Sequence, residues 1–484
     1  MERAPFDLRA ELLRPAPAWA FWGLASCVTA CFLLAFAAFA FPLSYCDSPS
    51  WAASYLARLV GEETLLSAKQ RGLLVPAWFQ FWGGLSIASG FGNLIGLVQG
   101  SALAAAAWAV LLRVRRGMTT AELLVLPAFV LSGLRHAIYS QTLLSESLVI
   151  PLVIAVALWI LRTGALSLWQ CGIVAALAAL AANARIESLL LVPLLLGRIA
   201  TDPAPLRERA RALGLAGFVV VGAFVSLDLV SPPVRGEPIG RVMIVAEWMR
   251  FTEAPDNALA RLLHFDLVER LEAETAVRHI RHIYDGLAPA RALFRGAAAP
   301  DGTDILRLLA YQLANRPIAV LEDRLETLAD LHASAYAAFW PAYRPWGAFY
   351  SPYDQVFARW TADDLDQARY SCPAFARAQA LHYGRPAIRS ESALRLLQVL
   401  HEAAGGYTRW LLRWLYWAAI PACLYLLARG RASRSYAWLT GLVLASLVLR
   451  AAFVCADERY QLPVDLLAVA WLMLTLRHSL ARVR

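Results

Sequence analysis

Long apolar runs, separated by short polar connections, dominate the chain. They lie at residues 19–41, 93–112, 121–134, 143–161, 167–183, 187–200, 211–230, 409–428, 435–454 and 462–477. A helix that crosses the hydrocarbon core needs about 20 mainly apolar residues. The short runs that begin at Ala121 and Glu187 are therefore the least typical of membrane-spanning helices. The pattern predicts an all-α, polytopic membrane helix bundle of about ten spans.

Basic residues alternate from one connection to the next. If the N-terminus is cytoplasmic, every short cytoplasmic connection carries arginine, for example Arg113, Arg162 and Arg434. The opposite short connections hold one arginine each, with an acidic residue nearby. Because cytoplasmic loops are enriched in Lys and Arg, the pattern predicts a multi-pass protein with both termini in the cytoplasm.

Composition supports this interpretation. Charged residues make up 17% of the chain, against about 25% in an average soluble protein. The formal charge of +9 is explained by the basic connections, so no nucleic-acid partner is expected. The first apolar run is longer than the core of about 7–15 residues in a cleavable signal sequence, and we expect it to remain as a span.

Two outer connections are long enough to hold structure of their own. Residues 42–92 contain amphipathic, aromatic-rich stretches that are typical of helices in the membrane interface. Residues 231–407 are charged, with helical periodicity, and predict an α-helical extracytoplasmic domain. This domain separates an N-terminal transmembrane module (1–230) from C-terminal transmembrane helices (408–484).

Ionisable residues gather at the outer ends of the expected spans. Charges at that depth are costly unless they pair or line a wet cavity. As a set they predict a site for an anionic ligand, although a single arginine there is better explained by a guanidinium that reaches the lipid headgroups. The set comprises Asp47, Arg135, His136, Glu146, Arg185, Glu187, Arg450, Asp457, Glu458 and Arg459.

Asp47 has two interpretations. It follows the first span in the segment YCDSPSW, and Asp, Ser and Pro are common where a helix starts. It is therefore a candidate N-cap for the next helix and equally a candidate catalytic carboxylate. Arg185 and Glu187 are two residues apart and do not face each other on a helix, so each is expected to have a partner elsewhere.

Cysteine and histidine patterns predict no metal site. The seven cysteines include no CxxC pair and no Cys/His cluster at zinc spacing. Cys46, Cys372 and Cys455 are expected on the same extracytoplasmic side. A disulfide between two of them and three free thiols are both compatible with the sequence. His279 and His282 have a spacing that permits ligation on a helix, but no further ligand accompanies them, and surface histidines explain them better.

The order of features resembles the GT-C superfamily of membrane glycosyltransferases, in particular bacterial relatives of protein O-mannosyltransferases and aminoarabinose transferases. An acidic residue and an interfacial loop follow the first span. YSQTLLSESLVIPLVIAVALWILR is similar to that group's Ser/Thr-Glu opening of the fourth span, GIVAALAALAANARIESLLLVPLLL to its Arg-x-Glu turn, and ERYQLPVDLLAVAWLML to its Arg-Tyr-x-x-Pro turn. The likeness covers most of residues 19–200 and 310–477.

The resemblance implies inverting sugar transfer from a polyprenyl-phosphate-linked donor to an acceptor hydroxyl on the extracytoplasmic face of a bacterial inner (plasma) membrane. Asp47 would be the general base for the attacking hydroxyl. Arginines would stabilise the departing phosphate, and Glu146 would bind the sugar or support the base. The partners would be the donor, membrane lipids and a glycan, lipid or protein acceptor. The implied donor-binding residues are Arg135, Glu146, Arg185, Glu187, Arg459 and Tyr460.

Departures from the family pattern leave alternatives open. No Asp-x-Asp pair directly follows the first span, and Asp47 is single where many relatives have two adjacent carboxylates. The sequence therefore does not decide whether a divalent cation is required, and no other cofactor is expected. A lipid-linked glycan ligase or polymerase, a transporter or flippase of lipid-linked sugars, and a non-enzymatic scaffold are the competing functions. Transporters tend to show repeats and midplane charges, whereas these charges lie at span ends, which favours transfer.

Overall fold

The computed structural model describes residues 8–43, 48–59, 61, 73–115, 117–230, 245, 302–322, 372–430, 433–453 and 462–481. Regular secondary structure in these ranges is helical, and isolated β-bridges are the remaining backbone pairings there. The prediction of an all-α fold is therefore confirmed for the described part of the chain.

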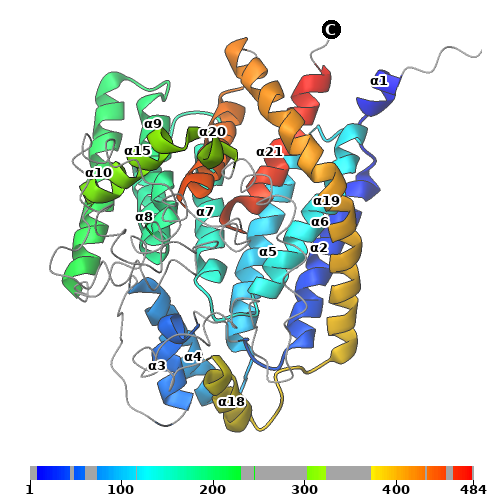
Figure 1. The fold of residues 1–484 in the computed structure, drawn as a ribbon, viewed down its shortest axis with the longest axis vertical. Coiled ribbons are helices and arrows are strands. Elements are labelled where there is room, and N and C mark those ends of the chain that lie inside the picture. Colours follow the sequence, from blue (N-terminus) through cyan, green and yellow to red (C-terminus); the bar gives the residue numbers. More distant parts are fainter. Residues whose placement is uncertain are drawn as a thin grey trace, which may run out of the picture. The chain divides into compact units, whose positions relative to one another are not determined.

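Each apolar run of the sequence coincides with a helix to within a few residues, or forms part of a longer helix (Figure 1). These helices are α2 (Ala18–Ala38), α5 (Leu94–Arg115), η1 (Thr120–Val125) with α6 (Leu126–Tyr139), α7 (Glu146–Ile160), α8 (Leu168–Ala184), η2 (Ile186–Leu190) with α9 (Leu191–Ala200), α10 (Leu206–Val230), α19 (Glu391–Ala428), α20 (Arg434–Phe453) and α21 (Leu462–Ala481). The other described helices are α1 (Leu8–Leu12), α3 (Ser48–Leu59), α4 (Leu74–Ser89), α15 (Gly302–Asn315) and α18 (Cys372–Tyr383).

Membrane character is visible in the length and composition of these helices. Among the described residues, four helices are long and apolar enough to cross a bilayer: Ala18–Ala38, Leu94–Arg115, Thr120–Tyr139 and Leu206–Ser226. Shorter apolar helices include Glu146–Ile160 and Leu168–Ala184. The structure thus indicates a membrane protein, while the ten crossings and the side of each connection stay predictions.

The chain forms two compact units. The first contains Met1–Pro232, Tyr336–Ser446 and Gln461–Arg484, and the second contains Pro233–Ala335 and Leu447–Tyr460. In the second unit, α15 is amphipathic: Ile305, Leu308 and Tyr311, spaced by three residues, are buried, while Leu306 is exposed. The extracytoplasmic position proposed for residues 231–407 stays a prediction. The described residues 372–407 belong to the first unit, where α18 contacts α3 and α19 contacts α2, α6 and α21.

The first unit is a bundle in which α21 is central. It packs against α5, α6, α7 and α19, and the stretch from Val464 to Met473 is buried on every side. The indole of Trp471 donates to Thr440 Oγ1 at 2.9 Å, and Tyr436 Oη lies 2.7 Å from Thr475 Oγ1. These bonds join α20 to α21 and satisfy polar groups that would otherwise be costly inside an apolar bundle.

Small residues set the closest helix crossings. At the α2–α6 crossing, a Cβ placed on Gly133 would lie 3.1 Å from Cγ2 of Val28, which is closer than nine in ten real Cβ contacts. Small residues at such positions let two backbones approach closely in membrane bundles. Gly214 of α10 is the opposite case, since nothing lies within 4 Å of the corresponding Cβ position.

Replacement of Gly133 with leucine is therefore expected to lower the free energy of unfolding by about 1–3 kcal/mol through overpacking. The matched variant Gly214→Leu should leave stability nearly unchanged, because its side chain enters open space. Thermal melting of the detergent-solubilised protein measures both. Equal melting temperatures for the two variants would show that the α2–α6 crossing is looser than described here.

The arginines of the predicted cytoplasmic connections are built into the fold. Arg198 is 1% exposed, forms an ion pair with Asp202, and donates to the carbonyl oxygens of Ile160, Arg162 and Gly164 at 3.2, 3.2 and 2.6 Å. It thereby satisfies acceptors that the end of α7 leaves open. Arg434 Nη2 lies 3.7 Å from the same Asp202 carboxylate. We call this the basic end of the bundle; α2, α6 and α8 end at the other, which we call the Glu146 end.

Candidate functional site

The loop between α6 and α7 forms the floor of the Glu146 end, and its backbone is held by the chain that leaves α2. Leu43 N donates to Gln141 O at 2.6 Å, and Leu143 N donates to Leu43 O at 3.0 Å. Every residue from 140 to 145 is buried. A buried loop requires partners for its polar backbone groups, and here the segment after the first span supplies two of them.

Polar side chains at the start of α5 fix the same loop. Asn93 Nδ2 donates to Gln141 Oε1 at 2.9 Å and to Phe39 O at 3.0 Å, and Gln141 Nε2 donates to Gly96 O at 3.2 Å. With its amide nitrogen facing the loop, Gln99 donates to Ser140 O at 2.8 Å and to Thr142 O at 3.2 Å. This network leaves the loop little freedom to move relative to α5.

The first residue after this loop is Glu146, which opens α7. Its carboxylate forms an ion pair with Arg185 and accepts a hydrogen bond from Ser145 Oγ at 3.2 Å. Arg185 directly follows α8, so this ion pair joins the end of α8 to the start of α7. The side chains are 1% and 9% exposed. Two of the residues implied by the sequence are thus brought together from segments 39 residues apart.

A second buried ion pair lies at the same end. Arg135, one residue before the last turn of α6, donates through Nη1 to Asp465 Oδ2 at 3.2 Å, with side chains 3% and 6% exposed. Asp465 lies in the first turn of α21 and was not among the residues expected from the sequence. The sequence did contain a signal for Asp465: it is a lone carboxylate near the start of an apolar run, and such a charge needs a partner. His136 donates through Nδ1 to Ser132 O at 2.6 Å.

Several sequence predictions fall outside what the structure describes. Residues 44–47 and 454–461 are not described, and the side chain of Glu187 is not described although its backbone lies in η2. The choice between cap and catalyst at Asp47 thus stays a prediction, as does the disulfide. The predicted residues concerned are Asp47, Asp457, Glu458, Arg459 and Tyr460, with Cys46, Cys455, His279 and His282, and the side chain of Arg450 is likewise not described.

Beside this end, α3 packs against α4 and against α18, and the three helices form a small group, as Figure 1 shows. Tyr55 of α3 is fully buried, and its hydroxyl lies 3.1 Å from that of Tyr383, which in turn lies 2.8 Å from Ser86 Oγ. Burial, and after it the neighbouring Tyr383, raises the pKa of Tyr55 well above its ordinary value of 10. The phenol therefore stays protonated and remains a neutral hydrogen-bonding group.

The segment between α18 and α19 connects this group of helices to the end of α2 through hydrogen bonds. Ala40 N donates to Ala387 O at 2.7 Å, and Arg389 N donates to Ala38 O at 2.8 Å. The guanidinium of Arg389 also donates to Phe36 O at 2.7 Å and lies 5.1 Å from the centre of the Phe36 ring. The segment before residues 44–47 is thus held by backbone bonds, whereas α3 after them is joined to α18 through the hydroxyl groups of Tyr55 and Tyr383.

The arrangement holds the guanidinium groups of Arg135 and Arg185 in place through buried carboxylates. Guanidinium geometry matches phosphate oxygens, so these groups are candidate contacts for an anionic ligand. Among the described residues, no group of three or more His, Cys, Asp or Glu side chains is placed to hold a metal ion.

Comparison with known proteins adds no constraint: no family model, curated protein or solved structure matches the chain.

Proposed function

We propose that the chain is a membrane glycosyltransferase that moves a sugar from a polyprenyl-phosphate-linked donor to an acceptor hydroxyl on the extracytoplasmic face. The proposal rests on the resemblance of its sequence segments to the GT-C superfamily and on the chemistry of the Glu146 end. Its location would be a bacterial inner membrane, with lipid carriers and a glycan, lipid or protein acceptor as partners.

The pairing of Glu146 with Arg185 is the observation that supports it best. Both residues lie in the segments that carry the resemblance, and the structure holds them in contact with almost no exposure. A guanidinium held by a buried carboxylate keeps one orientation, which is the condition for stabilising a charge that develops only in the transition state. A surface arginine that reaches freely for lipid headgroups would not need such a partner.

The position of Asp47 in the sequence agrees with this arrangement. Asp47 comes four residues after Leu43, whose backbone is bonded to the loop that ends at Glu146. Four extended residues span at most about 14 Å, so covalent connection alone limits how far Asp47 can be from that loop. A general base and a phosphate-binding arginine in one site need a separation of this order or less, since a single sugar bridges them.

The proposed step is a single displacement. The acceptor hydroxyl gives its proton to the Asp47 carboxylate as its oxygen bonds to the anomeric carbon, and the bond from that carbon to the phosphate oxygen breaks. The electron pair leaves with the polyprenyl phosphate, whose added negative charge is stabilised by Arg185 and Arg459. Arg135, held by Asp465, would position α6 against α21. Glu187 and Tyr460 would complete the donor site.

Glycan analysis of a strain that lacks this chain tests the proposal. We expect the loss of one defined sugar from lipid-linked, polysaccharide or protein-linked glycans, and its return when the wild-type chain is supplied. The undecorated acceptor should accumulate together with the lipid-linked donor. Unchanged glycans in all three fractions would contradict transferase activity, and a donor that accumulates only on the cytoplasmic side would indicate a flippase.

A further inference from the structure

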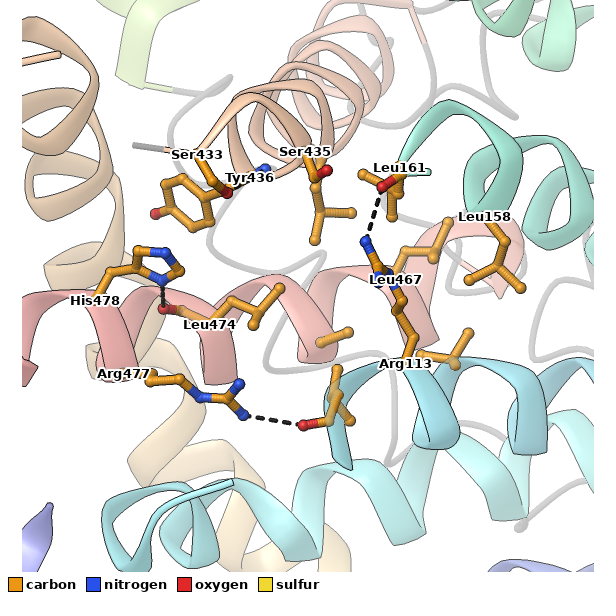
Figure 2. A pocket seen from close by; sticks show the side chains of 14 residues that line it. Arg113, Leu158, Leu161, Ser433, Ser435, Tyr436, Leu467, Leu474, Arg477 and His478 are labelled. Carbon is orange, nitrogen blue, oxygen red and sulfur yellow. Dashed lines mark hydrogen bonds between the residues drawn. The ribbon is translucent and has the colours of Figure 1, made fainter. Parts of the chain in front are cut away.

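A second candidate site lies at the basic end of the bundle, away from the Glu146–Arg185 pair. A cavity of about 210 Å³ opens between α5, α7, α20 and α21 (Figure 2). Sites that enclose a drug-sized molecule usually measure about 300–1,000 Å³. This cavity is therefore suited to a headgroup or part of a chain and not to a complete sugar donor.

The charge of the cavity comes from one arginine. Arg477 is neutralised by Glu122, whose carboxylate accepts from Nη2 at 2.6 Å and from Nε at 3.1 Å. Arg113 is different: its Nη2 donates to Leu161 O at 2.8 Å, and among the described residues it has no carboxylate partner. Arg113 is also exposed. Among the described residues that line the cavity, Arg113 thus supplies an accessible positive charge that no carboxylate balances.

The opposite wall adds further hydrogen-bonding groups. Figure 2 shows the His478 ring facing Tyr436 of α20, and the two rings stack with centroids 4.9 Å apart. His478 Nδ1 donates to Leu474 O at 2.7 Å, so Nε2 is the nitrogen left for other contacts. Ser435 of α20 and Ser433, just before this helix, also line the cavity. A phosphate oxygen can accept from hydroxyl groups of this kind as well as from a guanidinium.

The remaining lining is aliphatic. Val110 of α5, Leu158 of α7, Leu439 of α20 and Leu467 of α21 each face the cavity. Leu158 is only half-buried. An arginine and hydroxyl groups beside this apolar wall match an amphiphile whose headgroup is anionic and whose body is hydrocarbon. A free inorganic anion would gain nothing from the aliphatic side.

Neighbouring residues place the cavity at headgroup depth. Two residues along α5, Arg115 stacks over Phe21 and Trp22, with its guanidinium carbon 4.9 and 5.4 Å from the ring centres. Next to Leu161, the Arg162 guanidinium lies 5.3 Å from the Trp159 ring. Tryptophan and arginine gather where a bilayer meets water, and basic pockets between helices at that level bind anionic lipid headgroups.

We propose that this cavity binds the phosphate headgroup of an anionic phospholipid, with Arg113 as the charged contact and an acyl chain against the Leu158 side. Such a lipid would connect α5 and α7 to α20 and α21. The site is separate from the proposed reaction, so it can be present or absent whatever the fate of the transferase assignment.

The test measures lipid binding to the purified full-length protein by native mass spectrometry and thermal melting. Phosphatidylglycerol is expected to stay bound and to raise the melting temperature, whereas phosphatidylcholine should do neither. Arg113→Gln should weaken phosphatidylglycerol binding about five- to tenfold, since an arginine near a charged headgroup contributes about 1 kcal/mol or somewhat more. Arg162→Gln is the matched control, because Arg162 lies at the same level but does not line the cavity, and it should bind lipid like the wild type.

Leu158→Trp provides a second variant that fills the apolar side without changing charge, and it too should lose lipid. It decides the question if Arg113→Gln does not fold. Equal stabilisation by phosphatidylcholine, equal loss in Arg162→Gln, or full lipid retention in Leu158→Trp would overturn the proposal. Protection by inorganic phosphate equal to that by phosphatidylglycerol would overturn the lipid assignment and leave a simple anion site.

Discussion

Replacement of Asp47 with asparagine is expected to lower sugar transfer by about 10²–10⁴-fold, the usual contribution of a general base. Asparagine keeps the size and hydrogen-bonding reach of the side chain but cannot accept the proton of the attacking hydroxyl. If Asp47 is only an N-cap, asparagine substitutes well, because the two residues are about equally good caps. The same variant thus separates the two interpretations of Asp47 that the sequence leaves open.

The measurement is transfer activity in membranes from a strain that lacks the chromosomal copy, normalised to the amount of folded protein. Glu391→Gln is a suitable control, because Glu391 is a surface carboxylate that is 78% exposed. Activity that survives in Asp47→Asn would move the base elsewhere, with Glu62, Glu146 and Asp457 as the next candidates. Labelling of a cysteine at position 47 from the cytoplasmic side only would refute the proposed topology of the site.

Removal of one partner from the Glu146–Arg185 pair is expected to have the largest effect on stability. Arg185→Gln leaves the Glu146 carboxylate, 1% exposed, without its cation, and an uncompensated buried charge costs about 3–5 kcal/mol. The double variant Glu146→Gln/Arg185→Gln should recover most of that loss, because two amides of similar size can bond to each other. Transfer should not recover, since the guanidinium that stabilises the leaving phosphate is still missing.

Thermal melting and transfer activity of the two single variants and the double variant form a complete double-mutant cycle. The exposed pair Glu391 and Arg395, 4.0 Å apart and 78% and 80% exposed, provides the reference cycle. Its coupling should be under about 1 kcal/mol. Full recovery of transfer in the double variant at Glu146 and Arg185 would show that the pair is structural and would remove Arg185 from the proposed mechanism.

The sequence predicted the helices well and their exact ends less well. The apolar run at 409–428 marks only half of α19, which begins at Glu391 after Ser390 accepts a bond from Ala393 N at 3.3 Å. Hydropathy detects the apolar half, whereas a helix continues through polar residues until its capping groups are satisfied. The run from 143 likewise begins before α7, because residues 140–145 are engaged with Leu43 and α5.

The candidate site was predictable as a set of residues and not as a set of contacts. Span ends locate Arg135, Glu146 and Arg185 at one level, but nothing in the sequence says which carboxylate meets which arginine. Arg135 meets Asp465, 330 residues away in sequence. Such a pairing depends on α6 lying against α21, and that packing is decided by small residues and side-chain shape rather than by hydropathy.

Arg198 illustrates how one residue can act both during membrane insertion and in the folded bundle. During insertion its positive charge would help to keep that connection on the cytoplasmic side, a task that any cation performs. Once the bundle has assembled, the planar guanidinium group of Arg198 donates to three carbonyl oxygens and forms an ion pair with Asp202. A lysine there would retain the orienting charge and lose the planar guanidinium, so of the two cations only arginine performs both tasks.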